Sequence, residues 1–218
     1  MKRIMIIDAL NLFLRSYIVN PTISKDGKPI GGTAGFLKSL QKLSREIKPD
    51  AIVVCWDGRD GSRKRKQTNK NYKAGRSPIR LNRNVRVLSE DQEKENKIWQ
   101  MYRTFDYLNH FPVIQLIADE VEADDLIAYV CRYSAFKDDQ KVIVSSDKDF
   151  YQLLDNTTII HRPVQKQYLN KAHILEDFGI HPQNFALARA IAGDPSDNLS
   201  GIGGVGLKTV AKRFIFFC

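Results

Sequence analysis

The chain alternates short apolar runs with longer stretches in which apolar residues recur at helical spacing. The apolar runs predict buried strands at residues 3–7, 51–56, 113–116, 142–144 and 157–160. The periodic stretches predict helices at 9–19, 33–47, 93–108 and 122–133, and a short helix at 150–154. Strands that alternate with helices in this way indicate a three-layer α/β domain with a mainly parallel central sheet.

The pattern changes after about residue 170. Helices are predicted at residues 172–178 and 184–192, and a glycine-rich segment follows at 201–206. We therefore expect residues 1–170 to form the α/β domain and residues 171–218 to form a small helical subdomain.

A polar segment interrupts the α/β pattern between residues 58 and 90, and it holds most of the chain's excess charge. Residues 62–88 contain ten Lys or Arg and no acid, whereas the formal net charge of the chain is +9. The rest of the chain has 24 basic and 25 acidic residues. The basic excess thus belongs to one protruding, partly helical segment, which favours an anion-binding element.

Acidic residues follow several of the predicted strands or begin the helix after them. Parallel strands bring their carboxyl ends to one edge of a sheet, where ligands bind. Carboxylates that meet there repel one another unless a cation lies between them, and two Mg²⁺ or Mn²⁺ ions would suit this many hard oxygen ligands. Such a pair can activate a water molecule and stabilise the leaving oxygen of a phosphodiester. The candidates are Asp8, Asp57, Glu122, Asp124, Asp125, Asp147, Asp149, Asp194 and Asp197.

Each of these acids has a structural alternative. An Asp after a strand often caps the next helix, and Asp194 followed by Pro195 fits a helix start. Acids near residue 122 could also complement a helix dipole. The joint occurrence of the acids at strand ends in a basic chain favours the metal site.

The segment from Gly201 to Gly206 indicates a second kind of binding. Glycines let a backbone approach a phosphate or a cation closely, and the helix that follows offers free N–H groups. With helices on both sides, Gly201, Gly203, Gly204 and Gly206 predict a helix-hairpin-helix that grips a nucleic-acid backbone, with Lys208 and Lys212 adding phosphate contacts. The alternative is a flexible linker, but linkers favour Ser over the apolar residues found here.

Tyr72, Lys73 and Arg76 lie together in the basic segment. Tyrosine can stack on a base and the two cations can hold phosphate, although a solvated charge run is an equally good explanation.

The remaining residues exclude other classes. No apolar run approaches the ~18 residues of a membrane span, so we expect a cytoplasmic protein that makes no membrane contact. Cys55, Cys131 and Cys218 show no metal or disulfide spacing, and the first two are expected to be buried thiols. The four histidines are scattered and are expected to be exposed or hydrogen-bonded.

Together these motifs resemble the structure-specific 5′-nuclease (flap endonuclease) family, above all the phage 5′-exonucleases and the 5′-nuclease domain of bacterial repair DNA polymerases. The matching pieces follow the family order along nearly the whole chain. They are Asp8, CWDG at 55–58, YKAGR at 72–76, VEADD at 121–125, SSDKDF at 145–150, GDPSDN at 193–198 and GIGGVG at 201–206.

The resemblance implies a role for each motif. Lys73 and Arg76 would contact the scissile phosphate beside Tyr72, and the glycine hairpin would also bind K⁺. Glu120 is a further acid that could contribute to the metal site. The first metal would be held by Asp8, Asp57, Glu122, Asp124 and Asp125, and the second by Asp147, Asp149, Asp194 and Asp197.

The resemblance also implies an organisation and partners. Residues 1–170 would be a PIN-like catalytic domain with a basic helical arch at about 60–90, and residues 171–218 a helix-hairpin-helix subdomain that is cut short, because family members continue further. The substrates would be DNA with a 5′ flap or 5′ end and RNA–DNA hybrids, in primer removal during replication. A monomer is expected. It could bind a replication polymerase or a single-strand binding protein. If the gene is from a phage, the protein would act in the host cytoplasm.

Two other functions remain open from the sequence. A toxin-like single-strand ribonuclease of the PIN type would share the strand-end acids but would lack the arch and the glycine hairpin. A non-catalytic DNA-binding module would not need so many carboxylates, which oppose DNA binding without metal.

Overall fold

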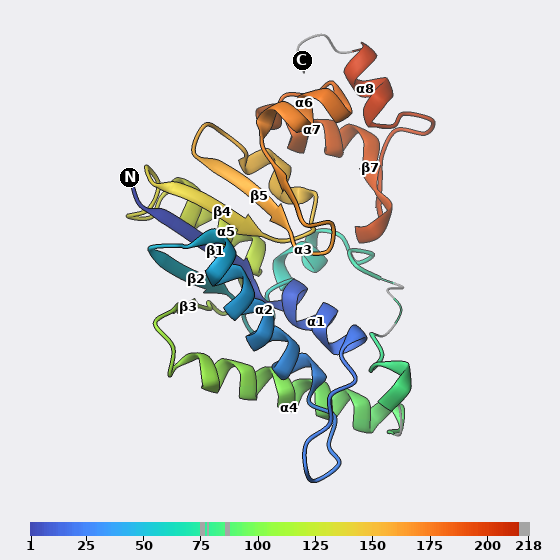
Figure 1. Cartoon of the computed structure of the whole chain (residues 1–218). Coiled ribbons are helices and arrows are strands. Elements are labelled where there is room, and N and C mark those ends of the chain that lie inside the picture. The colour runs from blue at the N-terminus through green and yellow to red at the C-terminus, as the bar shows by residue number, and fades with distance from the viewer. Residues whose placement is uncertain (75–76, 78, 86–87, 214–218) are drawn as a thin grey trace.

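The computed structural model describes residues 1–74, 77, 79–85 and 88–213. Its centre is a six-stranded sheet with the strand order β3-β2-β1-β4-β5-β6 (Figure 1). All neighbouring strands are parallel except β5 and β6. The mainly parallel sheet that the alternating pattern predicted is therefore confirmed. The strands are β1 Arg3–Asp8, β2 Ala51–Cys55, β3 Ile114–Leu116, β4 Gln140–Val144, β5 Thr158–Arg162 and β6 Gln167–Leu169.

Helices cover both faces of this sheet, as a three-layer domain requires. On one face Met5 and Ile7 of β1 pack with apolar residues of α1 (Ala9–Val19), α2 (Gly31–Ile47) and α4 (Glu90–Leu108). On the other face Ile4 and Ile6 pack with α5 (Ala123–Arg132). The period-2 alternation of β1 thus divides its side chains between two cores. The central strand is buried on both sides and forms a rigid base for Asp8 at its end.

The C-terminal segment packs on the α5 face of the sheet (Figure 1). Ile174, Phe185 and Val210 belong to the same buried cluster as Ile4 and Ile6. This contact fixes the position of the segment relative to the carboxyl ends of the strands. Its elements are α6 Lys171–Phe178, α7 Pro182–Ala192, β7 Gly193–Asp194, η3 Pro195–Asp197, β8 Leu199–Ser200 and α8 Leu207–Arg213.

Three local features differ from the sequence prediction. The short strand β6 was not predicted, because its three residues are too few to show a period. Helix α4 begins earlier than expected, since Ser89 and Gln92 form a reciprocal capping box. The segment after Asp147 is the 3₁₀ turn η2, Asp149–Leu153.

The predictions for two cysteines are confirmed, whereas the prediction for one histidine is wrong. Cys55 and Cys131 are buried free thiols, as expected. The expectation for the histidines is wrong for His161, which is 3% exposed and whose Nδ1 has no hydrogen-bond partner among the described residues. Its ring lies 4.5 Å from the ring of Tyr168, centroid to centroid, so β6 covers it with an aromatic side chain instead.

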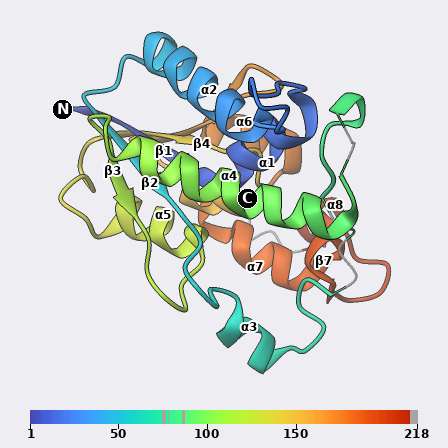
Figure 2. The same cartoon turned by 90° about the horizontal axis from the view of Figure 1, so that it is seen from below.

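The basic segment is partly helical, with α3 at Arg63–Thr68 and the 3₁₀ turn η1 at Arg83–Val85. In Figure 2 the helix α3 stands off from the sheet. Arg76 and Cys218, both named above, lie outside the described residues. Within the described part of the chain, no helix is both long enough and apolar enough to cross a lipid bilayer.

Candidate metal centre

The register of the sheet brings the predicted acids to one edge. Asp8 at the end of β1 pairs with Cys55 of β2, and Ile7 pairs with Val144 of β4. Asp57 and Asp147 follow these strands within three residues. The carboxyl ends of three neighbouring strands therefore deliver acids to the same place.

A cavity of about 160 Å³ opens at this edge and is lined mainly by carboxylates. Lys73 and the side chains of Asn11 and Ser196 are also in its wall. Seven of the nine predicted acids line it. They are Asp8, Asp57, Asp124, Asp147, Asp149, Asp194 and Asp197.

Several of these acids are structural caps, which is the alternative that the sequence left open, and capping does not exclude metal binding. Asp8 Oδ1 accepts from Asn11 N at 3.1 Å, and Asp57 Oδ1 accepts from Ala123 N at 2.9 Å. Asp194 Oδ1 accepts from the backbone N–H of Ser196 at 2.9 Å. In each case one oxygen is fixed by the backbone, which orients the other oxygen of the same carboxylate.

The crowding of acids changes their proton affinity. Burial raises the pKa of Asp8 to about 6, with the charges of Asp57 and Asp147 adding to the rise and hydrogen bonds from Asn11 and Ser145 opposing it. Burial, together with the charges of Asp8 and Asp147, raises the pKa of Asp124 to about 8. A cation bound in the cavity would oppose both shifts and favour the ionised carboxylates.

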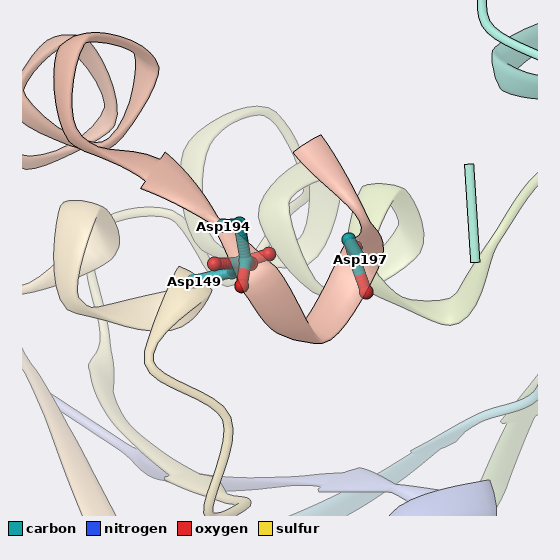
Figure 3. Close-up of side chains that lie close together, drawn as sticks. All are labelled: Asp149, Asp194 and Asp197. Atoms are coloured by element: carbon teal, nitrogen blue, oxygen red, sulfur yellow. The ribbon is translucent and has the colours of Figure 1, made fainter. Parts of the chain in front are cut away.

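Asp149, Asp194 and Asp197 form the tightest group. Each offers one carboxylate oxygen, and these oxygens lie within 4.8 Å of one another. Figure 3 shows the carboxylates of Asp149 and Asp194 side by side, with Asp197 beyond them on η3. Arg189, in the last turn of α7, forms ion pairs with both Asp149 and Asp194.

Glu122 and Asp125 do not line the cavity and instead bind the basic segment. Arg65 Nη1 donates to Glu122 Oε2 at 2.5 Å, and Arg65 Nη2 donates to Asp125 Oδ1 at 3.0 Å. Lys73 Nζ donates to the other Glu122 oxygen at 2.9 Å. Glu120 is likewise paired with Arg63, at 2.6 Å. The acids around the start of α5 therefore anchor the basic segment.

Tyr72 also lies against Glu122. Its ring is 7% exposed and its hydroxyl donates to Glu122 Oε2 at 3.2 Å. Burial raises the pKa of Tyr72 to about 12. The backbone also joins the basic segment to the acid cluster, because Lys73 N donates to the carbonyl oxygen of Asp197 at 2.9 Å.

The glycine segment combines a packed end with an open end. A Cβ on Gly201 would lie 2.2 Å from the carbonyl carbon of Ala192, so only glycine fits there. Gly203, Gly204 and Gly206 have no heavy atom within 4 Å of such a Cβ. Those three glycines, Lys208 and Lys212 are exposed. The turn therefore presents backbone and two cations to the outside before helix α8.

Sequence reasoning did not single out Arg65, Ser145 and Arg189. Ser145 Oγ donates to Asp8 Oδ2 at 2.9 Å, and the two arginines are cations that contact the acids. Arg189 lies five residues before Asp194 at a helix end, a spacing that could have indicated the contact.

A parallel sheet with carboxylates gathered at its strand ends, beside a basic segment and a glycine hairpin, defines the class of metal-dependent nucleases. The particular family is shown by the sequence. Residues 3–179 match the N-terminal, resolvase-like domain of 5′-3′ exonucleases, and the chain belongs to this family.

Curated relatives agree with this assignment. The chain is 30% identical over 212 residues to a 5′-3′ exonuclease of Aquifex aeolicus, covering 96% of this chain and 68% of that protein. It is 32% identical over 214 residues to the flap endonuclease Xni of a Shewanella strain, covering 97% and 74%. It is also 30% identical to the thermostable DNA polymerase I of Thermus thermophilus, but there the match spans 98% of this chain and only 24% of the polymerase.

Solved structures share the fold. A T5 5′-exonuclease structure with bound zinc has a TM-score of 0.76 at 20% identity, covering 97% of this chain and 74% of that one. Human GEN1 in complex with Holliday junction DNA has a TM-score of 0.57 at 15% identity, covering 97% and 48%. At these identities the likeness concerns the fold.

Proposed function

We propose that this chain is a divalent-metal-dependent 5′-nuclease that hydrolyses phosphodiester bonds at 5′ flaps and 5′ ends of DNA or of RNA–DNA hybrids. The observation that carries the proposal is the cavity at the strand ends with its seven carboxylates. Hydrolysis would leave a 5′-phosphate and a 3′-hydroxyl.

The donor chemistry of the cavity fits Mg²⁺ or Mn²⁺. Its acidic ligands are all carboxylates, and no Cys or His is among the residues that line it. Hard oxygen ligands with water completing the shell suit these ions, whereas thiolates would favour zinc. The raised pKa values of Asp8 and Asp124, caused first by burial and then by neighbouring carboxylates, are what a bound cation would reverse.

The acids divide into two groups in this proposal. Asp8, Asp57 and Asp124 would hold the first ion, and Asp147 with the Asp149–Asp194–Asp197 group would hold the second. Bound there, two ions would supply an activated water and stabilise the leaving oxygen. Glu122 and Asp125 would act through water or through the arch residues that they bind.

The arch and the glycine turn would hold the substrate. Lys73 lines the acid cavity, so its ammonium group can reach a phosphate there once it leaves Glu122. Arg76 would assist it. The open glycines, Lys208 and Lys212 would bind the duplex backbone, with K⁺ on the carbonyl oxygens of the turn. Tyr72 would support Lys73 from its buried position.

The organisation and the biological role are also proposals. Residues 1–170 would be the catalytic domain and residues 171–218 a DNA-gripping subdomain that packs on it. The chain spans about a quarter of the length of its DNA polymerase relatives. The nuclease would act as a monomer and remove primers, next to a polymerase or a single-strand binding protein.

The test is cleavage of a 5′-labelled flap substrate with Mg²⁺ by the wild type, Asp147→Asn and the control Asp106→Asn. Asp147 lines the cavity, whereas Asp106 is an exposed acid on α4. Loss of a ligand should slow cleavage by about 100-fold or more, and the control should match the wild type. Equal rates for Asp147→Asn and the wild type would contradict the proposal.

Two further substrates separate the alternatives. Cleavage of single-stranded RNA but not of flap DNA would support the PIN-type ribonuclease. Metal-independent binding of flap DNA without cleavage would support a binding module. The proposed nuclease should cleave the flap and should need the metal for it.

A further inference from the structure

Arg189 lies inside the group of acids that would hold the second ion. Its Nη2 atom is 3.0 Å from Asp149 Oδ1 and also contacts Asp194 Oδ2. The side chain is 20% exposed, so its guanidinium group is largely withdrawn from water. Among the described residues, Arg189 is the one side-chain cation within ion-pair distance of either aspartate. A single guanidinium therefore offsets only part of the negative charge of two clustered carboxylates.

Asp194 does not need Arg189 to hold its orientation. The backbone N–H and the hydroxyl of Ser196 both donate to Asp194 Oδ1, at 2.9 Å and 2.6 Å. Arg189 contacts the other oxygen, Oδ2. The carboxylate is thus oriented by Ser196, while Arg189 contacts the group from its other oxygen.

A guanidinium and a divalent ion are competing partners for such oxygens. A Mg²⁺ ion demands near-ideal octahedral geometry at about 2.0–2.1 Å from its ligands, and two cations on the same oxygens repel each other. We infer that Arg189 is an internal competitor for the Asp149–Asp194–Asp197 group, which makes the second ion bind more weakly than the first. This inference rests on the proposed two-metal nuclease.

The test is a calorimetric titration of the nucleic-acid-free protein with Mn²⁺ and with Ca²⁺. Arg189→Gln removes the charge, and Arg132→Gln is the control because Arg132 pairs with Asp155 at 2.9 Å outside the cavity. The more weakly bound ion should bind about tenfold more tightly to Arg189→Gln than to the wild type. This is the effect expected when a positive charge a few ångströms from the ion is removed. Arg132→Gln should bind like the wild type. Arg189→Lys, which keeps the charge, should lie between the two.

The opposite result has a distinct meaning. Weaker or unchanged binding of the second ion by Arg189→Gln would overturn the inference and make Arg189 a residue that positions the two aspartates. If the wild type and Arg132→Gln bind no divalent ion at all, the proposed function fails instead.

A second measurement needs no variant and covers the case in which Arg189→Gln does not fold. Phenylglyoxal modifies accessible guanidinium groups, and peptide mass spectrometry gives the extent at each arginine. Saturating Ca²⁺ should increase modification of Arg189 several-fold and leave Arg132 unchanged. Equal modification of Arg189 with and without Ca²⁺, in protein shown to bind the ion, would overturn the inference.

Discussion

The cavity that would bind metal should weaken the metal-free fold, and Asp124 is the residue at which this can be measured. Burial and the charges of Asp8 and Asp147 raise its pKa to about 8. Asp124→Asn removes the ionisable group and nearly preserves its shape. The substitution should therefore stabilise the metal-free protein at pH 8 while it weakens metal binding.

The direction of this stability change follows from the linkage between proton binding and folding. In the unfolded chain Asp124 ionises at the ordinary aspartate pKa of 3.8, whereas the folded protein keeps the proton up to about pH 8. The folded state binds more protons across this window, so the free energy of unfolding falls as pH rises from about 4 to 8. Each unit of pKa shift corresponds to about 1.4 kcal/mol. Because the neighbouring acids share the penalty, we expect a gain of about 2 kcal/mol for Asp124→Asn at pH 8.

The assay is urea unfolding at pH 5 and pH 8 in EDTA, followed by circular dichroism. Asp106→Asn, on the exposed face of α4, is the matched control and should show no gain at either pH. The advantage of Asp124→Asn should be large at pH 8, small at pH 5, and reversed when Mg²⁺ is added at pH 8. A variant that is equally or less stable than the wild type at pH 8 without metal would refute the electrostatic reasoning.

Three further predictions concern other parts of the site. Glu122→Gln should weaken the contacts of Arg65 and Lys73 and speed tryptic cleavage within residues 62–74 several-fold, whereas slower or equal cleavage would show that the arch is held otherwise. Gly201→Ala should cost more than about 2 kcal/mol in urea unfolding, because its Cβ meets backbone, and Gly203→Ala should be neutral. Chelation with EDTA should abolish flap cleavage, and Mg²⁺ should restore it and raise Tm at pH 8.

The parts of the site that could be predicted are those governed by local periodicity. Asp8, Asp57 and Asp147 follow apolar strands, and the parallel order of those strands is enough to bring their carboxylates together. The glycine turn was also visible, because the spacing of its glycines between two helical stretches needs no tertiary information.

The parts that could not be predicted depend on contacts between distant segments. Glu122 and Asp124 are two residues apart, yet Glu122 binds the basic segment and Asp124 lines the cavity, because Glu122 is the extended N-cap of α5 and Asp124 lies in its first turn. The sequence allowed Tyr72 to stack on a base, and only the structure shows that the residue is buried and that its hydroxyl contacts Glu122. Gly201 is required by the approach of Ala192, which only the packed structure reveals.

The hydrogen bond from Lys73 N to Asp197 O has a consequence for the order of folding. It joins residues 124 positions apart, and the cavity beside it also needs Asp8 from the first strand. Contacts of such long range form late, after most of the loop entropy has been lost. During synthesis the acids can converge only after the segment near Asp197 has left the ribosome. Divalent-ion affinity would thus report completed folding, and a nascent chain would lack the complete acid cavity until the segment near Asp197 has been made.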